Sequence, residues 1–224
     1  KNYSIPSDID YFHCTSNNTI YGTQLKEFPK TDGLLVCDMS SDIFSKPVDV
    51  SKFDIIYAGA QKNLGPAGTT LFIVKDSILG KSSVAIPTML NLQTHADKDS
   101  MFNTPPVFSI YTSMLTLRWI KSLGGLTAIE KLNNAKAELL YNEIDRNPLF
   151  EGTAVTEDRS YMNVCFTLKD DTKKEAFDTL WNEANISGIK GHRSVGGYRA
   201  SIYNAMPIES IQVLVDVMKA LENK

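Results

Sequence analysis

Three short apolar runs, each followed at once by small polar residues, constrain the fold of this chain more than any other feature. The runs occupy residues 9–14, 33–37 and 54–57. Runs of this length, rich in branched and aromatic residues, are typical of buried strands. A fourth run at residues 69–74 follows the third across a Gly-Pro-Ala-Gly turn, so we expect it to run antiparallel to the third. The sequence therefore predicts an α/β fold with a mostly parallel sheet.

The apolar residues change to helical spacing from Val107 onward. One stripe is formed by Ile110, Met114, Leu117 and Ile120, and a second, after Gly124-Gly125, by Ile129, Leu132, Ala135 and Leu139. We expect both stripes to face a core. A strand at 161–168, a helix at 173–184, a strand at 199–203 and a last helix from residue 208 then predict a smaller α+β unit. The expected division is residues 1–106, part of a large domain, and residues 107–224, a linking helix with a small domain.

Two stretches of the chain follow neither a strand nor a helix period. Residues 15–19 are small and polar and predict a loop after the first strand. Residues 78–106 form a much longer irregular connection. Because a long connection without regular structure is usually functional or lies at an interface, we expect one of these roles for it.

Lys62 lies just beyond the end of the predicted strand 54–57, before a turn that contains Gly65 and Pro66. The ends of strands in α/β sheets are where ligands bind. A lysine partly withdrawn from water there loses its proton more readily and can form a Schiff base with an aldehyde. A solvated lysine in a surface loop is equally compatible with these residues alone. The glycines do not follow the order of a phosphate-binding P-loop.

Asp38 lies at the carboxyl end of the predicted strand 33–37, as Lys62 lies beyond the end of its own strand. We therefore expect both to face one crevice at that edge of the sheet. A carboxylate for a protonated ring nitrogen and a lysine for a Schiff base are the usual protein partners of pyridoxal phosphate. An aspartate at this place is also typical of a capped turn, which by itself is the commoner role.

A third polar cluster contains His192, Arg193 and Arg199 around the Gly196-Gly197 pair. The planar fork of arginine matches carboxylate and phosphate groups, so the cluster suits a small substrate with two anionic groups. Taken without the other clusters, a solvated hairpin is the more common explanation of such residues.

Composition excludes several functional classes. The net charge of -3 and the pI of about 5.7 leave no basic field for nucleic acid or an anionic membrane. Cys14, Cys37 and Cys165 form no C-x-x-C pair, so we expect no disulfide and no metal site, and a reducing compartment. No long apolar run and no signal-peptide pattern occur, which predicts a soluble, cytoplasmic chain.

Three segments resemble the phosphoserine aminotransferases, a family in class V of the fold type I pyridoxal-phosphate enzymes. They are residues 57–68, the Asn-Thr-Pro-Pro segment 103–106, and residues 191–207. Gly-Ala-Gln-Lys-Asn marks the class, whereas Gly-His-Arg and Ala-Ser-Ile-Tyr-Asn-Ala-Met-Pro mark the family. The resemblance runs from end to end. It implies a C-terminal portion of a longer enzyme whose upstream residues complete the cofactor site.

The resemblance implies a role for each candidate residue in binding pyridoxal 5'-phosphate. Lys62 would attach the cofactor and later carry the proton of the substrate Cα. The residues implied in other cofactor contacts are Asp38 at the ring nitrogen, Thr19 on the side of the phenolic oxygen, Gln61 at the phosphate, and Asn103 and Thr104 at the phosphate bound to a neighbouring subunit. The last two imply a homodimer with shared active sites.

The implied substrates are small anions. Arg199 would hold the substrate α-carboxylate, and His192 with Arg193 would hold the distal phosphate or carboxylate. The implied reaction exchanges an amino group between L-glutamate and 3-phosphohydroxypyruvate, giving O-phospho-L-serine and 2-oxoglutarate in serine biosynthesis, with vitamin B6 biosynthesis as a second pathway. Two alternatives remain. One is another class V enzyme, such as a desulfurase, which needs a nucleophilic cysteine on a mobile loop. The other is a non-catalytic dimerising fragment.

Overall fold

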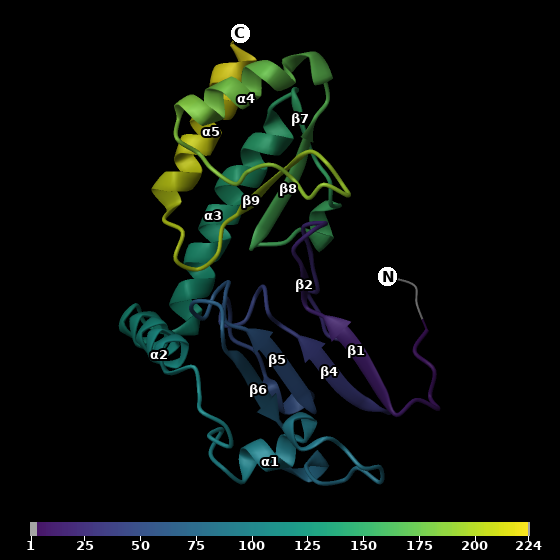
Figure 1. The fold of residues 1–224 in the computed structure, drawn as a ribbon. Coiled ribbons are helices and arrows are strands. Elements are labelled where there is room, and N and C mark those ends of the chain that lie inside the picture. The colour runs from purple at the N-terminus through teal and green to yellow at the C-terminus, as the bar shows by residue number, and fades with distance from the viewer. Residues whose placement is uncertain (1–3, 224) are drawn as a thin grey trace.

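The computed structural model describes residues 4–223, and the predicted sheet forms its lower half in Figure 1. Its strands are β1 (Tyr11–Thr15), β4 (Leu34–Asp38), β5 (Ile55–Gly59) and β6 (Thr70–Val74), in the order β1-β4-β5-β6. The pairs β1-β4 and β4-β5 are parallel, and β5-β6 is antiparallel. All four predicted strands are present, and the predicted directions are confirmed.

The two faces of this sheet have different surroundings. One face packs on a core that includes Leu35, Cys37, Ile56 and Ala58. The other face leaves side chains such as Tyr11 and those of residues 34 and 72 exposed. Since side chains alternate along a strand, Asp38 and Tyr57, which are paired in register, lie on this second, open face.

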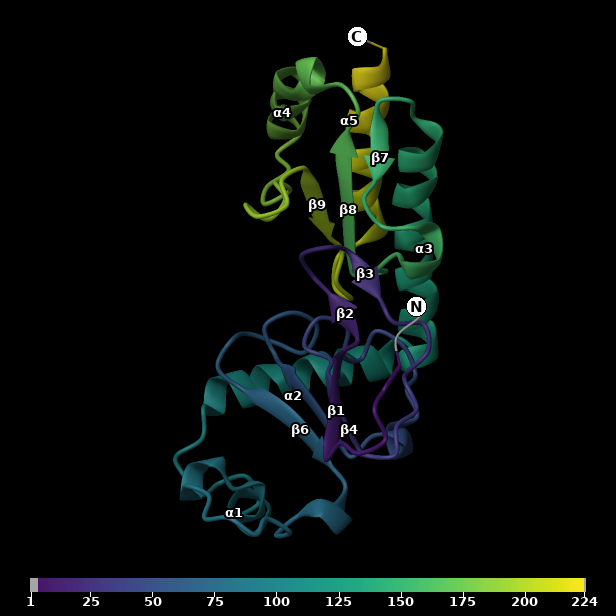
Figure 2. The same ribbon diagram turned by 90° about the vertical axis from the view of Figure 1, so that its right-hand side faces the viewer.

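The predicted loop at 15–19 is wrong in part, because it contains one strand of a small hairpin. Strands β2 (Asn17–Asn18) and β3 (Thr23–Gln24) pair antiparallel and lie between the sheet and the upper half of the molecule (Figure 2). The Asn17 side-chain amide donates to Ser41 Oγ and to Asn163 Oδ1, both at 2.8 Å. Polar side chains hold this hairpin, so no apolar alternation marks it in the sequence.

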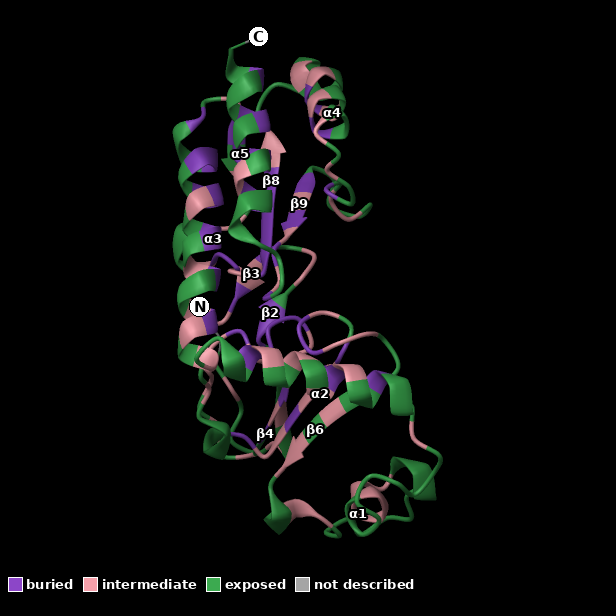
Figure 3. Ribbon diagram, turned by 90° about the vertical axis from the view of Figure 1, so that its left-hand side faces the viewer, coloured by how far each residue is buried: buried purple, intermediate pink, exposed green. Residues whose placement is uncertain are grey.

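Helix α2 (Val107–Ser122) is present as predicted, but its predicted core stripe is wrong in part, since only Ile120 of the four residues is buried. Ile110 and Leu117 are 46% and 39% exposed, whereas Ser109 and Ser113 are buried. The reason is the close approach of α2 to the turn after β5. A Cβ on Gly65 would lie 2.7 Å from Ser113 Oγ, and one on Gly68 would lie 2.8 Å from Ser109 Oγ. Only small residues fit at this contact, and much of the rest of α2 is exposed (Figure 3).

Helix α3 (Leu126–Arg146) also differs from its predicted stripe. Ile129 is buried as predicted, Leu132 and Ala135 are exposed, and Leu139 is only partly buried. The buried face instead consists of Ile129, Asn133, Lys136, Ala137, Leu140, Tyr141, Glu143 and Ile144. Polar residues occupy core-facing positions of α3, so a search for apolar spacing finds the helix but not the side of it that is buried.

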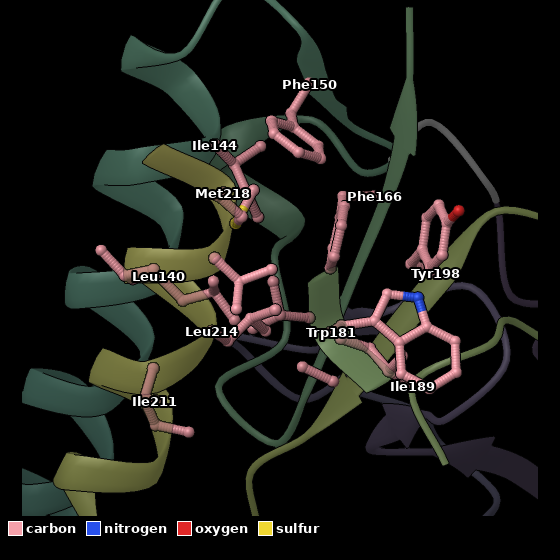
Figure 4. Packing of buried hydrophobic residues seen from close by; sticks show 14 of the residues in the cluster. Leu140, Ile144, Phe150, Phe166, Trp181, Ile189, Tyr198, Ile211, Leu214 and Met218 are labelled. Carbon is pink, nitrogen blue, oxygen red and sulfur yellow. The ribbon is translucent and has the colours of Figure 1, made fainter. Parts of the chain in front are cut away.

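The upper half contains the two strands and two helices predicted for the α+β unit, together with a strand, β7 (Phe150–Gly152), that was not predicted. Strands β7, β8 (Asn163–Leu168) and β9 (Tyr198–Ser201) form an antiparallel sheet in the order β7-β8-β9. Helices α4 (Lys174–Glu183) and α5 (Ile208–Glu222) complete it with α3. Side chains from α3, α5 and the strands point toward one another in a core around Phe150, Phe166 and Met218 (Figure 4).

The long connection is mostly irregular, as predicted, but it contains the short helix α1 (Leu92–Ala96). Asn91 Oδ1 accepts a hydrogen bond from the backbone N–H of Gln93 at 3.0 Å and caps this helix. Single 3-10 turns occur at Val50–Lys52, Asp76–Ile78, Thr88–Leu90, Thr156–Asp158 and Asp171–Lys173. Within residues 4–223, no helix is both long enough and apolar enough to cross a bilayer.

The two cores are built from separate parts of the chain. One cluster is formed by buried residues between 35 and 64, and the other by buried residues between 137 and 221. The expected boundary between residues 106 and 107 falls between them. Helix α2 follows that boundary yet packs against the turn at Gly65 and Gly68, so we propose that it belongs with the first unit.

Burial of Lys136 predicts a pH dependence of stability. Burial lowers the pKa of its amine to about 8 from 10.5, so the unfolded chain binds more protons between these two values. The cost of burying the charged amine is therefore present in full below pH 8 and is relieved as the pH rises to 10.5. Relative to Lys136→Met, the wild-type free energy of unfolding should rise by about 2–3 kcal/mol over this range. Urea unfolding at several pH values measures it, and parallel curves for the two proteins would contradict it.

Candidate active site

Lys62 follows β5 and lies beside the β2–β3 hairpin. Its Nζ donates a hydrogen bond to Thr19 Oγ1 at 2.8 Å. Burial lowers the pKa of Lys62, and the positive charge of Arg199 lowers it further, whereas the carboxylates of Asp38 and Asp42 oppose this shift. Lys62 is thus a partly buried amine with Asp38 and Arg199 close enough to act on its charge, and not a freely solvated loop lysine.

The backbone around Lys62 is fixed on both sides. The Leu64 and Gly65 N–H groups donate to the Ala60 carbonyl at 3.1 and 2.8 Å, which closes a helical turn after the strand. The adjacent Asn63 is buried, and its Oδ1 accepts a hydrogen bond from the backbone N–H of Asn204 at 3.0 Å. Ala60, two residues before Lys62, and Asn63, directly after it, therefore fix the position of the Lys62 backbone.

Asp38 lies at the end of β4, as predicted, and its Oδ1 accepts a hydrogen bond from the Ser40 N–H at 2.8 Å. The turn-capping role is therefore present in the structure. Burial raises the pKa of Tyr57, and the neighbouring Asp38 charge raises it further. The Tyr57 hydroxyl also lies 3.0 Å from His13 Nε2. His13 and Tyr57 were not predicted as site neighbours, although strand alternation places both on the open face with Asp38.

Arg199 lies in β9, opposite Cys165 in the register. Its backbone N–H donates to the Ile189 carbonyl at 2.7 Å, but its side-chain Nε is buried and has no hydrogen-bond partner among the described residues. A buried guanidinium N–H without an acceptor is costly. This atom marks a place where an anionic group of a ligand would satisfy the site.

His192 and Arg193 occupy the loop that leads into β9. The loop is closed by a hydrogen bond from the Gly191 N–H to the Gly197 carbonyl at 2.9 Å. The Ser194 N–H donates to His192 Nδ1 at 3.3 Å, so a neutral His192 carries its proton on Nε2 and offers it as a donor. Arg193 is exposed. The loop is therefore a solvent-exposed turn, as the alternative explanation required, and its exposed donors are also free to bind an anion.

Three predicted cofactor contacts remain, namely Gln61, Asn103 and Thr104. Gln61 is exposed beside Lys62. Asn103 and Thr104 are exposed on the segment between α1 and α2, which lies away from the β2–β3 hairpin in Figures 1 and 2. The only side-chain hydrogen bond described for Asn103 is a local one to the Thr104 carbonyl at 3.1 Å. The structure therefore brings together Lys62, Thr19, Asp38 and Arg199, but not Asn103 and Thr104.

This arrangement has a definite chemical capacity. A partly buried amine can attack a carbonyl compound, and a nearby carboxylate can hold a proton or a positive charge. A guanidinium with an unpaired N–H can orient a carboxylate. Attachment of a carbonyl group and binding of an organic anion can thus occur within one site.

Comparisons with known proteins identify the family of the chain. The family model described as aminotransferase class-V matches residues 3–214. The phosphoserine aminotransferase of Flavobacterium johnsoniae is 68% identical over 224 residues, and that of Parabacteroides distasonis is 58% identical over 226 residues; both alignments cover 100% of this chain. The chain spans 63% and 64% of the lengths of these two relatives.

Solved structures give the same result. A phosphoserine aminotransferase at 47% identity superposes with a TM-score of 0.95, covering 99% of this chain and 62% of that one. The pyridoxal-phosphate-bound phosphoserine aminotransferase of Trichomonas vaginalis, at 36% identity, superposes with a TM-score of 0.91 and covers 97% and 62%. The sheet of the first half and the α+β unit of the second are thus the α/β fold of these enzymes. The chain belongs to the class-V aminotransferase family.

Proposed function

We propose that the whole protein transfers an amino group between L-glutamate and 3-phosphohydroxypyruvate, giving O-phospho-L-serine and 2-oxoglutarate, with pyridoxal 5'-phosphate as cofactor. The observation that carries this proposal is the partly buried Lys62 amine, on which Asp38 and Arg199 act electrostatically. The names of the relatives at 58% and 68% identity support the choice of substrates. A Lys, Asp and Arg set of this kind is what a transaminase of two anionic substrates needs.

The residues present fit pyridoxal phosphate. When bound, the cofactor supplies an electron sink that makes the Cα–H bond of an attached amino acid acidic. Lys62 would attach it, Asp38 would hold a proton on its ring nitrogen, and Thr19, already 2.8 Å from Lys62 Nζ, would lie beside its phenolic oxygen. Gln61 would contact its phosphate. The unpartnered buried Arg199 Nε supports the presence of an anionic ligand in the same place.

Lys62 would also move the substrate proton. A general base works best when its pKa is near the operating pH. Burial and Arg199 lower the pKa of Lys62, so more of the amine is neutral near neutral pH than for a solvated lysine. We infer that Lys62, once the substrate amine has displaced it from the cofactor, removes the proton from the substrate Cα and would deliver it to the cofactor carbon C4′. Amino transfer to the keto acid would use the same proton transfer in reverse. The hydroxyl of Thr19 orients this amine.

Arg199 would bind the substrate α-carboxylate, and His192 with Arg193 would bind the distal anionic group. The His192 Nε2–H donor and the exposed Arg193 guanidinium both lie in the loop that leads into β9, the strand that carries Arg199. A phosphate and a side-chain carboxylate can share this clamp, which explains how one site serves phosphoserine and glutamate.

The clamp predicts a substrate-selective loss. Arg193→Ala should lower kcat/KM for O-phospho-L-serine about 10–100-fold, which is the effect of losing one charge-assisted contact. The variant keeps the contact with the α-carboxylate but loses a contact with the distal phosphate. L-Alanine, an amino donor without a distal anion, should react more slowly than phosphoserine with the wild type, and its kcat/KM should change little in Arg193→Ala. Lys169→Ala, which removes an exposed positive charge elsewhere, is the matched control. An equal loss for both donors in Arg193→Ala would contradict the assignment.

We propose that the whole protein is a homodimer in which Asn103 and Thr104 reach the cofactor phosphate of the partner. The outer side of α2 and the segment before it expose large apolar side chains, among them Val84, Met89, Leu90, Met101, Phe102, Val107, Phe108, Ile110, Tyr111 and Leu115. Figure 3 shows how much of α2 is exposed. A patch of this kind usually marks a protein interface.

The dimer proposal predicts a change of mass. Phe108 is 72% exposed on α2, so Phe108→Asp should convert a dimer into a monomer by placing a charge in the apolar interface. Light scattering of the whole protein measures the change. Arg118→Ala, at an exposed polar position of the same helix, should leave the mass unchanged. A wild-type protein that is monomeric at micromolar concentration would refute the dimer.

The cysteines argue against a desulfurase. Cys14, Cys37 and Cys165 lie in β1, β4 and β8, not on a mobile loop. Burial raises the pKa of Cys165 to about 11, which keeps the thiol protonated and unreactive at neutral pH. All three are free thiols, which supports a reducing, cytoplasmic location. The alternative of a dimerising fragment without catalysis is distinguished by the amino-transfer assay.

A further inference from the structure

A buried array of polar side chains links the segment of Lys62 to the strand of Arg199, and Asn204 is at its centre. Asn204 is only 5% exposed. Its backbone N–H donates to Asn63 Oδ1 at 3.0 Å, its side-chain amide donates to the Phe44 carbonyl at 2.9 Å, and its Oδ1 accepts from Asn133 Nδ2 at 2.9 Å. Asn204 thus contacts three different segments of the chain, and one of them adjoins Lys62.

Lys136 anchors the other side of this array. The side chain is 2% exposed, and its Nζ donates to the carbonyls of Ile202 at 3.0 Å and Tyr203 at 2.8 Å and reaches that of Asn204 at 3.5 Å. These are the residues by which the chain leaves β9. A buried ammonium is expensive unless its donors are used, and here backbone carbonyls use them. Helix α3 therefore holds the chain just beyond Arg199 through two side chains, Lys136 and Asn133.

The array also supports an unfavourable backbone conformation. Phe44 has a φ of 57°, which is uncommon for a residue other than glycine. Its carbonyl is the acceptor for the Asn204 amide. The neighbouring Ser45 carbonyl accepts the other donor of Asn133, at 3.1 Å. A strained loop of the lower half is thus held by amides attached to the upper half.

We propose that Asn204, held by Asn133 and Lys136, is a positioning residue that fixes the Lys62 amine relative to the Arg199 guanidinium. The inference rests on the proposed function, in which Arg199 binds the substrate carboxylate while Lys62 acts at the neighbouring Cα. Misplacement of reacting groups by about 1 Å can cost about 10²-fold in rate. Asn204 must both donate to Phe44 and accept from Asn133, so an aspartate, which cannot donate when ionised, is the smallest disruptive change.

The test uses the whole protein loaded with pyridoxal phosphate. Asn204→Asp should keep the absorbance band of the cofactor attached to Lys62, because Lys62 itself remains. It should weaken the binding of succinate, a non-reacting dicarboxylate, about 10-fold, measured by the change in that band on titration. It should lower kcat/KM for O-phospho-L-serine about 10²-fold. Asn147→Asp is the matched control. Asn147 is a buried asparagine of the upper core whose amide contacts Glu143 and the Met218 carbonyl, and it should affect stability alone.

A double-mutant cycle separates positioning from general damage. If Asn204 acts through Arg199, Asn204→Asp should weaken succinate binding in the wild type but have little further effect in Arg199→Ala. Additive losses, or losses that Asn147→Asp reproduces at an equal fall in melting temperature, would overturn the inference. The succinate titration does not require turnover of phosphoserine. A failed substrate assignment would therefore appear as absent turnover in the wild type, and a failed inference as additivity in the cycle.

Discussion

Replacing Lys62 with alanine is expected to lower kcat for amino transfer by about 10³-fold or more. A general base alone contributes about 10²–10⁴-fold, and the variant also loses the amine that attaches the cofactor. Lys62→Arg separates charge from chemistry. The arginine keeps a positive charge near Asp38 but stays protonated at every accessible pH, so it can neither attach the cofactor nor accept a proton.

Formation of L-glutamate from O-phospho-L-serine and 2-oxoglutarate measures this loss. Both Lys62 variants should be nearly inactive, whereas Lys52→Ala, an exposed lysine outside the site, should match the wild type. Activity in Lys62→Arg within 10-fold of the wild type would remove Lys62 from the chemistry and leave it only an electrostatic role.

The second large effect is expected for Asp38→Asn. The amide oxygen of asparagine can still accept the hydrogen bond from the Ser40 N–H, so the turn should persist. The negative charge that would hold a proton on the cofactor ring is lost, and a hydrogen bond to a charged group is worth about 1.5–3 kcal/mol, or roughly 10–10²-fold in kcat. Asp54→Asn, which removes a carboxylate paired with Lys75 at 2.8 Å away from the site, is the control.

Asp38→Asn also predicts the direction of a pH shift. The Asp38 carboxylate raises the pKa of Lys62 against the effects of burial and Arg199. Its removal should therefore lower that pKa, and lysine-selective labelling of the cofactor-free protein should become faster at Lys62 near pH 7. A labelling rate that falls in Asp38→Asn would contradict the proximity of the two charges.

The strands could be predicted from the sequence because each one is short, apolar and bounded by polar residues. The runs at 33–37 and 54–57 became β4 and β5 in the predicted parallel pairing, and the Gly-Pro-Ala-Gly turn gave the predicted antiparallel partner. In these segments the apolar runs of the sequence coincide with strands of which one face is buried. The placement of Asp38 and Lys62 followed from the same rule, since parallel strands bring their carboxyl ends to one edge.

The helix faces could not be predicted because packing in α2 and α3 does not follow hydrophobicity. Ser109 and Ser113 are buried because Gly65 and Gly68 approach them closely, a contact between residues far apart in sequence. Lys136 is buried because free carbonyls after β9 need donors. In both helices the residues that face the core are selected by a partner segment, which a stripe of apolar residues does not reveal.

The site was predicted only as a set of separate residues. No spacing in the sequence connects Thr19 with Lys62, yet the β2–β3 hairpin places them 2.8 Å apart. His13 and Tyr57 beside Asp38, and the Asn63–Asn204 contact, arise from the tertiary structure. The structure shows where these residues lie, but every role given to them stays a prediction. This holds for Thr19, Asp38, Gln61, Lys62, Asn103, Thr104, His192, Arg193 and Arg199, and the variants above test the roles of Lys62, Asp38, Arg193 and Arg199.

Amino transfer from phosphoserine is the activity that we propose for the whole protein, and a pair of assays distinguishes it from desulfuration. The whole protein, loaded with pyridoxal phosphate, is mixed with O-phospho-L-serine and 2-oxoglutarate, and L-glutamate is measured against time. In parallel, sulfide release from L-cysteine is measured. We expect glutamate formation that depends on Lys62, and no release of sulfide. Sulfide release without glutamate formation would contradict this proposal and identify a desulfurase.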